Sequence, residues 1–433
     1  MRFAPRVTTY PRSREVLVAP PATWRPRLDT SALVLAALAV AVIAGHSGSP
    51  AWQLLRVVAA LGAALGAFWC IERGSARTRG FASFGVGLIA VGIGLGISVP
   101  HVRKDELGIV ATAGITAHVA GVVLLVAGAA AVARSRSGWQ RVGETAAMVV
   151  FAVVWLYASG IAVAATNVPR TSLGATRPDD YGLRYDDVSF AASDGVTLSG
   201  WYIPSRNRAA LVLVHGAGST RASVLEQAAA LASRGYGILL FDARGHGRSG
   251  GRAMDFGWFG DQDVTGAVSY LSARADVDRE RIAVVGMSMG GEEALGAAAS
   301  DPRIKAVVAE GATGRVRADR AWLSNEYGVR GQLHELIDRV TYGLVDALTE
   351  ASPPISLRNA VGRMAPRPAL LITAAKVSDE ANAASFIRDG APETVQVWDV
   401  AGAEHTNGVD AQPDEWEARV VSFLERAFHD EVP

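Results

Sequence analysis

The sequence predicts two parts: an N-terminal bundle of about five membrane-spanning α-helices, and after it an α/β domain with a mostly parallel sheet and a small helical cap. Half of the 433 residues are hydrophobic, and this surplus is concentrated before residue 166. From residue 185 onward, short apolar runs of strand type alternate with helix-like segments. Because these strands are apolar throughout, we expect helices to cover both faces of their sheet.

The apolar part divides into five segments, at residues 31–45, 57–71, 81–99, 111–133 and 146–166. A helix needs about 20 apolar residues to cross a bilayer, and the last three segments meet this requirement. The first two are short and need flanking residues such as Leu28 and Leu54 to reach across. No polar face of helical period interrupts the segments, which disfavours a soluble bundle and makes the lipid bilayer the expected partner.

Basic residues predict the orientation of the bundle. The arm at residues 1–30 and the second and fourth connections together hold twelve arginines, whereas the opposite short connections hold only Arg56, Arg103 and Lys104. Since cytoplasmic loops carry the excess of Lys and Arg, the arm is expected in the cytoplasm. Five spans then place the C-terminal half outside. A cleaved signal peptide is the alternative for the arm, but four further spans favour an uncleaved anchor.

Glycine spacing within the apolar segments predicts close helix packing. The spacing Gly-x-x-x-Gly occurs twice and a repeat of seven residues once, in Gly62/Gly66, Gly92/Gly96 and Gly114/Gly121/Gly128.

Composition narrows the class of protein further. The 42 basic and 42 acidic residues give no net charge, so nothing indicates a nucleic-acid partner. The single cysteine, Cys70, excludes an intrachain disulfide and a cysteine-based zinc site. An Arg-, Ala- and Gly-rich chain of this kind is typical of GC-rich bacterial genomes, which suggests a bacterial plasma membrane.

The second part begins with a polar stretch at residues 167–184 that is expected to be a linker, followed by the α/β domain at residues 185–433. Its most informative feature is Gly286-Met287-Ser288-Met289-Gly290, between a strand-like run and a helix-like run. A serine in this context sits on a tight turn. Gly286 and Gly290 let the backbone bend without Cβ clashes and let a substrate approach. The pattern predicts Ser288 as a nucleophile.

With three further motifs, this turn makes residues 185–428 resemble the α/β-hydrolase fold. The motifs follow the third, fourth and last strands, at 215–218 (His-Gly-Ala-Gly), 242–249 and 402–405. The resemblance implies Ser288 as nucleophile and His405 as base, in the order Ser, acid, His. It implies the backbone amides of Ala217 and Met289 as donors to the oxyanion. His215 and Gly216 then belong to the supporting turn.

The acid that orients the base is left open between two neighbours. In the family it follows the strand at 368–374, and here Asp379 and Glu380 stand side by side. The usual pattern has glycine soon after that strand and Asp three residues on, whereas this chain has a longer, glycine-free approach. Asp379 is the first choice and Glu380 the alternative. The other one is expected in the first turn of a helix, where acids suit the helix dipole.

Other polar residues near the motifs have two interpretations each. His215 and His246 are alternative bases, but their positions match structural histidines of the family. Glu292 and Glu310 either bind a cationic group or pair with arginines such as Arg315. An insertion at residues 312–367 corresponds to the cap that sets substrate choice in this family.

These features predict a membrane-anchored serine hydrolase that cleaves ester or amide bonds of a small-molecule or peptide substrate through an acyl-enzyme intermediate. No metal or organic cofactor is required. Residues 193–195 and 257–261 also resemble the acylaminoacyl-peptidase-like and serine-aminopeptidase-like groups, so a peptidase is a rival. A membrane sensor or transport subunit with a non-catalytic, ligand-binding domain is the rival from another class.

Overall fold

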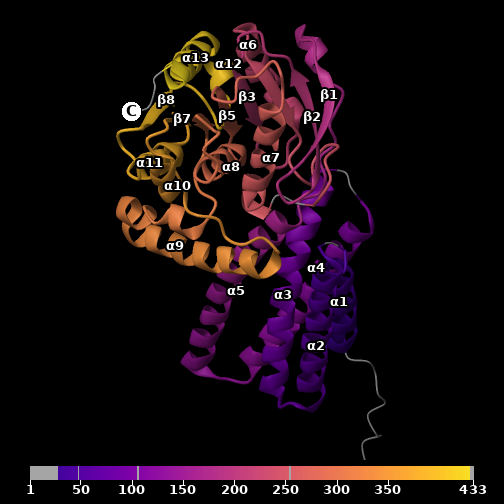
Figure 1. Cartoon of the computed structure of the whole chain (residues 1–433). Helices are drawn as coiled ribbons and strands as arrows, with labels where there is room; N and C mark the ends of the chain where they lie inside the picture. The colour runs from indigo at the N-terminus through magenta and orange to yellow at the C-terminus, as the bar shows by residue number, and fades with distance from the viewer. Residues whose placement is uncertain (1–27, 47, 105–106, 253–254, 430–433) are drawn as a thin grey trace, which may run out of the picture.

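The computed structural model describes residues 28–46, 48–104, 107–252 and 255–429. It consists of a helical bundle and an α/β domain that rests on one end of this bundle (Figure 1). The arginines of the N-terminal arm, on which the predicted orientation depends, lie within residues 1–27, outside the described residues.

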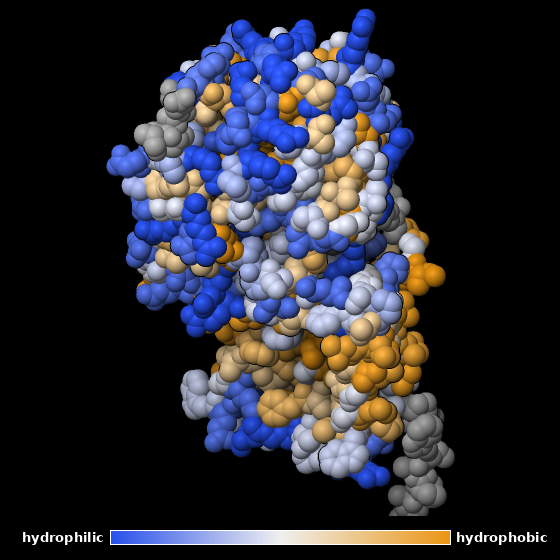
Figure 2. Space-filling view, in the orientation of Figure 1, coloured by the Kyte–Doolittle hydropathy of each residue, from blue (hydrophilic) through white to orange (hydrophobic). Residues whose placement is uncertain are grey.

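Five helices form the bundle, one for each predicted segment and each longer than predicted at one end or both: α1 (Leu28–Ala44), α2 (Pro50–Arg73), α3 (Ala76–Arg103), α4 (Ile109–Arg134) and α5 (Gly138–Thr166). By length and composition, α2 to α5 are suited to cross a membrane, and α1 is a shorter apolar helix of 17 residues. On the face of the bundle seen in Figure 2, apolar residues gather below the hydrophilic surface of the α/β domain. Four helices therefore suggest a membrane-spanning region, and five spans stay a prediction.

Small residues hold the central helices α3 and α4 together. A Cβ atom on Gly128 would lie 2.4 Å from the backbone nitrogen of Phe84, and one on Gly94 would lie 2.5 Å from that of His118. Such backbone contact leaves no room for a side chain. Gly62 and Gly66 make no such contact within the described residues: no atom lies within 4 Å of a Cβ position on either, because their side of α2 faces outward.

The helices alternate in direction, so α1, α3 and α5 all end beside the α/β domain (Figure 1). At this end, the Ser49 hydroxyl donates a hydrogen bond to the Glu350 carboxylate, and the Lys104 ammonium donates one to the carbonyl oxygen of Pro169. At the opposite end, Arg77 and Arg136 pair with Glu144. The basic connections of the sequence therefore lie on the side away from the α/β domain.

The α/β domain contains one eight-stranded sheet in the order β1-β2-β4-β3-β5-β6-β7-β8. The strands are β1 (Asp186–Ala191), β2 (Thr197–Ile203), β3 (Ala210–Val214), β4 (Gly237–Phe241), β5 (Ile282–Met287), β6 (Ala306–Glu310), β7 (Ala369–Ala374) and β8 (Val395–Val400). All neighbours from β4 to β8 are parallel, while β2 pairs with β1 and β4 antiparallel. The structure confirms the predicted mostly parallel sheet.

Helices cover both faces of the sheet, as the apolar strands require. One face packs against α7 (Gly260–Ser272), α8 (Met289–Ala298), α10 (Leu357–Met364) and α11 (Ser378–Arg388). The other face packs against α6 (Leu225–Ser233) and α13 (Pro413–His429), with the short α12 (Gly408–Ala411) beside it. The strands β3 and β4 are completely buried between these layers.

Two of the predicted boundaries differ from the structure. The expected linker at 167–184 lies against the α/β domain, with Leu173 in its core and a 3-10 turn at Pro178–Tyr181. Within the expected cap, only residues up to about 350 stand apart from the sheet. They include the 3-10 turn Arg317–Arg320 and the long helix α9 (Leu323–Leu348), which packs against α5 (Figure 1). The later α10 belongs to the sheet-covering layer, because its apolar face buries Leu357 and Val361 there.

Candidate active site

The candidate site lies at the carboxyl ends of the parallel strands, where ligands bind in sheets of this kind. Ser288 follows β5 directly and adopts φ 52° and ψ −124°, a conformation that L-residues rarely adopt. Backbone strain of this type costs about 1–3 kcal/mol. The turn forms because its glycines leave space: a Cβ on Gly286 would lie 2.2 Å from the Gly290 oxygen. The turn therefore presents the Ser288 hydroxyl at the edge of the sheet.

A series of hydrogen bonds runs from this hydroxyl through a histidine to a carboxylate. His405 Nε2 lies 2.9 Å from Ser288 Oγ, and His405 Nδ1 lies 2.6 Å from Glu380 Oε1. Glu380 is buried, and its second oxygen accepts the backbone N–H of Ala374 at 2.9 Å. The arrangement fits a neutral imidazole that donates from Nδ1 and accepts from the hydroxyl at Nε2. The hydrogen bond to Glu380 raises the pKa of His405 above its ordinary value.

The structure corrects the choice of Asp379 over Glu380. The Asp379 carboxylate points away from His405 and accepts the hydroxyl of Tyr327, from α9, at 2.6 Å. Neighbouring residues of a helix point in directions about 100° apart, so only one of the pair can face the histidine. A signal was present in the sequence: Glu380, Ala383, Ala384 and Ile387 have the spacing of one helix face, and all four are buried.

The turn after β3 lies next to the nucleophile. A Cβ on Gly216 would lie 3.3 Å from the Ser288 Cβ, which places the His215-Gly216-Ala217 backbone against the turn that holds the serine. Met289 is the first residue of α8, so its N–H has no partner in its own helix. Both residues therefore belong to turns beside Ser288. That their backbone N–H groups donate to an oxyanion stays a prediction.

His215 and His246 have structural positions rather than contact with Ser288 Oγ. His215 Nδ1 donates to the carbonyl oxygen of Gly216, and Nε2 accepts the N–H of Ala243 at 3.0 Å. Burial lowers the pKa of His215, and lowers that of His246 to about 4. Both imidazoles are therefore neutral at physiological pH, and His215 fixes the turn that carries Ala217.

The two glutamates near the site have partners other than arginine. Glu292 Oε1 accepts the backbone N–H groups of Thr313 and Gly314 at 3.0 and 2.8 Å. Glu310 accepts the N–H of Gly408 at 2.7 Å and the indole N–H of Trp416 at 2.9 Å. Its backbone oxygen also accepts the N–H of Ser288 at 2.7 Å. Burial raises the pKa of both carboxyls, and Glu310 ties the serine turn to the segment after His405.

Gly311 is a residue of the site that the sequence interpretation missed. It has φ +71°, and a Cβ there would lie 2.9 Å from His405 Cε1. Only glycine combines this conformation with this close approach. Its position directly after β6, at the same edge of the sheet as the other motifs, was the available signal.

The carboxyl edge of the sheet faces the helical bundle. The Lys104 ammonium, at the end of α3, donates to Thr171 Oγ1, and Thr171 in turn donates to the carbonyl oxygen of Gly218 at 2.8 Å. Gly218 closes the turn that carries Ala217. Within the described ranges, no group of three or more His, Cys, Asp or Glu side chains is placed to hold a metal ion.

Comparison with known proteins agrees with this architecture. The family described as "Serine aminopeptidase, S33" matches residues 205–359. An uncharacterized protein of Mycobacterium tuberculosis is 37% identical over 27% of this chain and 42% of its own length. A thiohydrolase of Aspergillus aculeatus is 33% identical over 30% of this chain and 42% of its own length. This chain thus spans less than half of either relative.

A solved structure, the esterase Pf2001 of Pyrococcus furiosus, is 25% identical over 60% of this chain and 97% of its own length, with a TM-score of 0.48. The strand order, the strained serine turn and the matched family define the C-terminal part as a domain of the α/β-hydrolase fold. The matched family and the thiohydrolase relative are hydrolases of different kinds.

Proposed function

We propose that this protein is a membrane-anchored serine hydrolase that cleaves esters through an acyl-enzyme intermediate. The observation that carries the proposal is the series of hydrogen bonds from Ser288 through His405 to the buried Glu380. In this role, Ser288 is the nucleophile, His405 the general base and Glu380 the acid that orients the base.

In the first step, Ser288 Oγ bonds to the carbonyl carbon while its proton passes to His405 Nε2. The carbonyl electron pair moves to the oxygen, where the backbone N–H groups of Ala217 and Met289 stabilise it. When the carbonyl re-forms, the bond to the alcohol breaks and the alcohol takes the proton from Nε2. Water then attacks the acyl-enzyme by the same route and releases the carboxylic acid. Glu380 stabilises the imidazolium that forms in each half of the reaction.

The burial and hydrogen bonding of two carboxylates near the site favour ester cleavage over aminopeptidase activity. An aminopeptidase also has to hold the free ammonium group of its substrate, for which a carboxylate with unused acceptors is the natural partner. Both glutamates are buried; the two oxygens of Glu310 and Oε1 of Glu292 already accept backbone or indole N–H groups. A peptidase is the second candidate, since the matched family is described as "Serine aminopeptidase, S33". Of the peptidase types, we favour the acylaminoacyl type because it needs no site for a free amino group.

Anchoring in a membrane is supported by α2 to α5 and by the apolar surface of the bundle seen in Figure 2. The basic residues at the end away from the hydrolase domain favour a cytoplasmic location for that end. The proposed orientation therefore has the hydrolase domain outside the cytoplasm, with its site directed at the bilayer surface. Proteolysis of intact cells tests it, because the hydrolase domain should be digested without lysis. Protection until lysis would contradict this orientation.

A fluorophosphonate probe on intact membranes tests the chemistry. The wild-type protein should be labelled and should hydrolyse p-nitrophenyl esters, whereas Ser288→Ala should do neither. Turnover of N-acylated peptide amides in the same preparation distinguishes the peptidase. If wild-type protein is not labelled, the non-catalytic, ligand-binding role replaces the hydrolase.

A further inference from the structure

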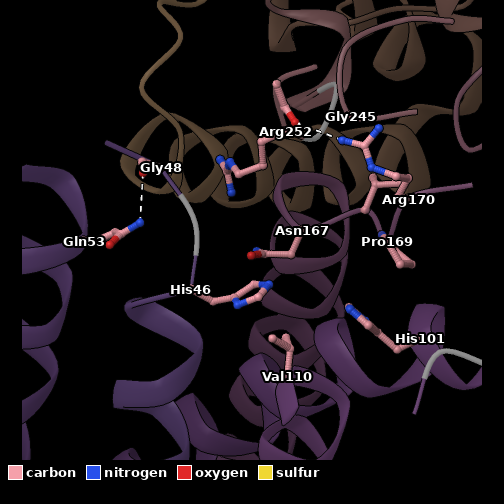
Figure 3. A pocket seen from close by; sticks show the side chains of 12 residues that line it. His46, Gly48, Gln53, His101, Val110, Asn167, Pro169, Arg170, Gly245 and Arg252 are labelled. Carbon is pink, nitrogen blue, oxygen red and sulfur yellow. Dashed lines mark hydrogen bonds between the residues drawn. The ribbon is translucent and has the colours of Figure 1, made fainter. Parts of the chain in front are cut away.

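A polar cavity separates the bundle from the hydrolase domain. It measures about 460 Å³ and is lined by the ends of α1, α3 and α4, by residues 167–170 and by the loop from Gly245 to Arg252. Figure 3 shows His46 and His101 projecting from two different helices toward the space below Asn167 and Arg252. The volume lies in the range of about 300–1,000 Å³ that is typical of ligand pockets.

The cavity has a cationic lining. Its twelve lining residues, all within the described part of the chain, include two arginines and two histidines but no aspartate or glutamate. The Arg170 guanidinium donates to neutral acceptors, the carbonyl oxygens of His246, Gly247, Ser249 and Gly251. These bonds fix its position, and within the described residues no carboxylate pairs with it. Arg252 donates to the Thr166 carbonyl oxygen at 2.8 Å and reaches Asp255, behind the lining, at 3.4 Å.

An apolar groove of about 590 Å³ begins at the same ends of α1 and α4. It is lined by Leu35, Leu38, Ala39, Val42, Leu107, Gly108, Ile109, Thr112, Ala113 and Thr116. Val42, near the end of α1, lines the groove, and His46, two residues after the end of α1, lines the cavity. On α4, Ile109 lines the groove and the adjacent Val110 lines the cavity. The cavity and the apolar groove therefore lie next to each other at the same end of the bundle, with no lining residue in common.

We propose that the cavity and the groove together bind one anionic membrane phospholipid, with the phosphate headgroup in the cavity and an acyl chain in the groove between α1 and α4. Arginine and phosphate form strong, charge-assisted hydrogen bonds, and basic pockets beside transmembrane helices suit anionic headgroups. A soluble phosphate compound would leave the groove empty, and an uncharged lipid would offer no counter-charge to the Arg170 guanidinium, whose hydrogen-bond acceptors are neutral carbonyl oxygens. The bound lipid holds the bundle and the hydrolase domain together, because both contribute lining residues.

The inference rests on the membrane anchoring of the proposed function but not on the chemistry of Ser288. The test uses the full chain in nanodiscs of phosphatidylcholine with and without phosphatidylglycerol, followed by native mass spectrometry of the lipids that stay bound. Wild type and Ser288→Ala should both retain one phosphatidylglycerol in preference to phosphatidylcholine. Equal retention of the two lipids would overturn the proposal, even if Ser288 labels normally.

Two kinds of variant locate the lipid. Arg170→Gln with Arg252→Gln should weaken retention of phosphatidylglycerol at least about tenfold, since both substitutions remove charge-assisted hydrogen bonds to the phosphate. The matched control is Arg234→Gln with Arg419→Gln. These surface arginines form ion pairs with glutamates on the far side of the hydrolase domain, so their loss should have no effect on lipid retention. Unchanged retention in the cavity variant would overturn the headgroup site.

The groove is tested by Thr116→Trp, which fills it with an indole and should also release the lipid. Its control is Val126→Trp, on the outward face of the same helix and 62% exposed. Thermal unfolding in nanodiscs that contain only phosphatidylcholine checks that each variant is folded. If glycerol phosphate without acyl chains displaces the lipid at equal concentration, the cavity is a site for soluble phosphate and the lipid proposal fails.

Discussion

The bundle and the hydrolase domain bury opposite kinds of residue. In the hydrolase domain, the strands place Val, Ile and Leu in a core whose exposed fractions are near zero, and polar residues cover the outside. In the bundle, glycines such as Gly94 and Gly128 lie at the helix contacts, while Leu65 and Val126 are 70% and 62% exposed. Water drives large apolar residues inward, but lipid tails are themselves apolar, so membrane helices associate through close packing of small residues.

The two parts also differ in whether they hold polar groups suited to chemistry. The hydrolase domain contains buried polar groups that are held by hydrogen bonds, such as Glu380, and a strained serine turn. The packed bundle contains close backbone contacts and has no comparable site in its interior among the described residues. A change in the hydrolase domain should therefore affect chemistry first, and a change in the bundle should affect stability first.

The largest effect is expected from Ser288→Gly. Removing Oγ should lower kcat/KM by a factor of about 10⁴–10⁶, as for the loss of a serine nucleophile elsewhere. Glycine adopts φ 52° freely, so the free energy of unfolding should rise by about 1 kcal/mol. Ester turnover and chemical denaturation measure the two quantities. A variant that loses both activity and stability would show that the serine turn is not strained.

A smaller effect on activity is expected from Glu380→Gln. The amide no longer favours the Nδ1–H tautomer of His405 or stabilises its cation, so kcat should fall by about 10²–10⁴. Asp379→Asn is the matched control and should leave kcat nearly unchanged, because Asp379 contacts Tyr327 instead. Steady-state kinetics of both variants decide between the two acids. The opposite ranking would restore Asp379 as the orienting acid.

In the bundle, Gly128→Leu should lower stability by about 1–3 kcal/mol or more, since the side chain would collide with the backbone of α3 at Phe84. Gly62→Leu should be tolerated, because its Cβ position is open. Thermal unfolding in detergent measures the difference. Fluorophosphonate labelling of the protein that stays folded should be the same in both variants; equal stability of the two would contradict the packing of α3 against α4.

The smallest effect concerns pH. Since His405 has to be neutral to act as base, and its bond to Glu380 raises its pKa, kcat/KM should fall as the pH decreases through a value above the usual 6.5. In Glu380→Gln this acidic limb should move to lower pH. The pH profile of residual turnover measures the shift. A limb that moves to higher pH in this variant would contradict the assigned partner of His405.

Several of these features could be predicted from the sequence because they depend on local patterns. Apolar runs located the five bundle helices and predicted the alternation of strands and helices in the second part, and the glycines around Ser288 indicated the turn. The choice between Asp379 and Glu380 was not made correctly, because it depends on which side of α11 faces the sheet. The role of Gly311 was missed for a similar reason: it depends on His405, which lies 94 residues away in the sequence.

The sequence by itself determined what kinds of element form and singled out Ser288 and His405 as candidates, because hydrophobic periodicity and turn residues act over a few positions. Only the tertiary structure decided which glutamate meets His405, which glycines lie at helix contacts, and that the edge of the sheet with Ser288 faces the bundle. These outcomes depend on the directions of side chains and on contacts between distant segments. The cavity between Arg170, Arg252 and the ends of α1 and α3 exists for that reason alone, since no single segment contains it.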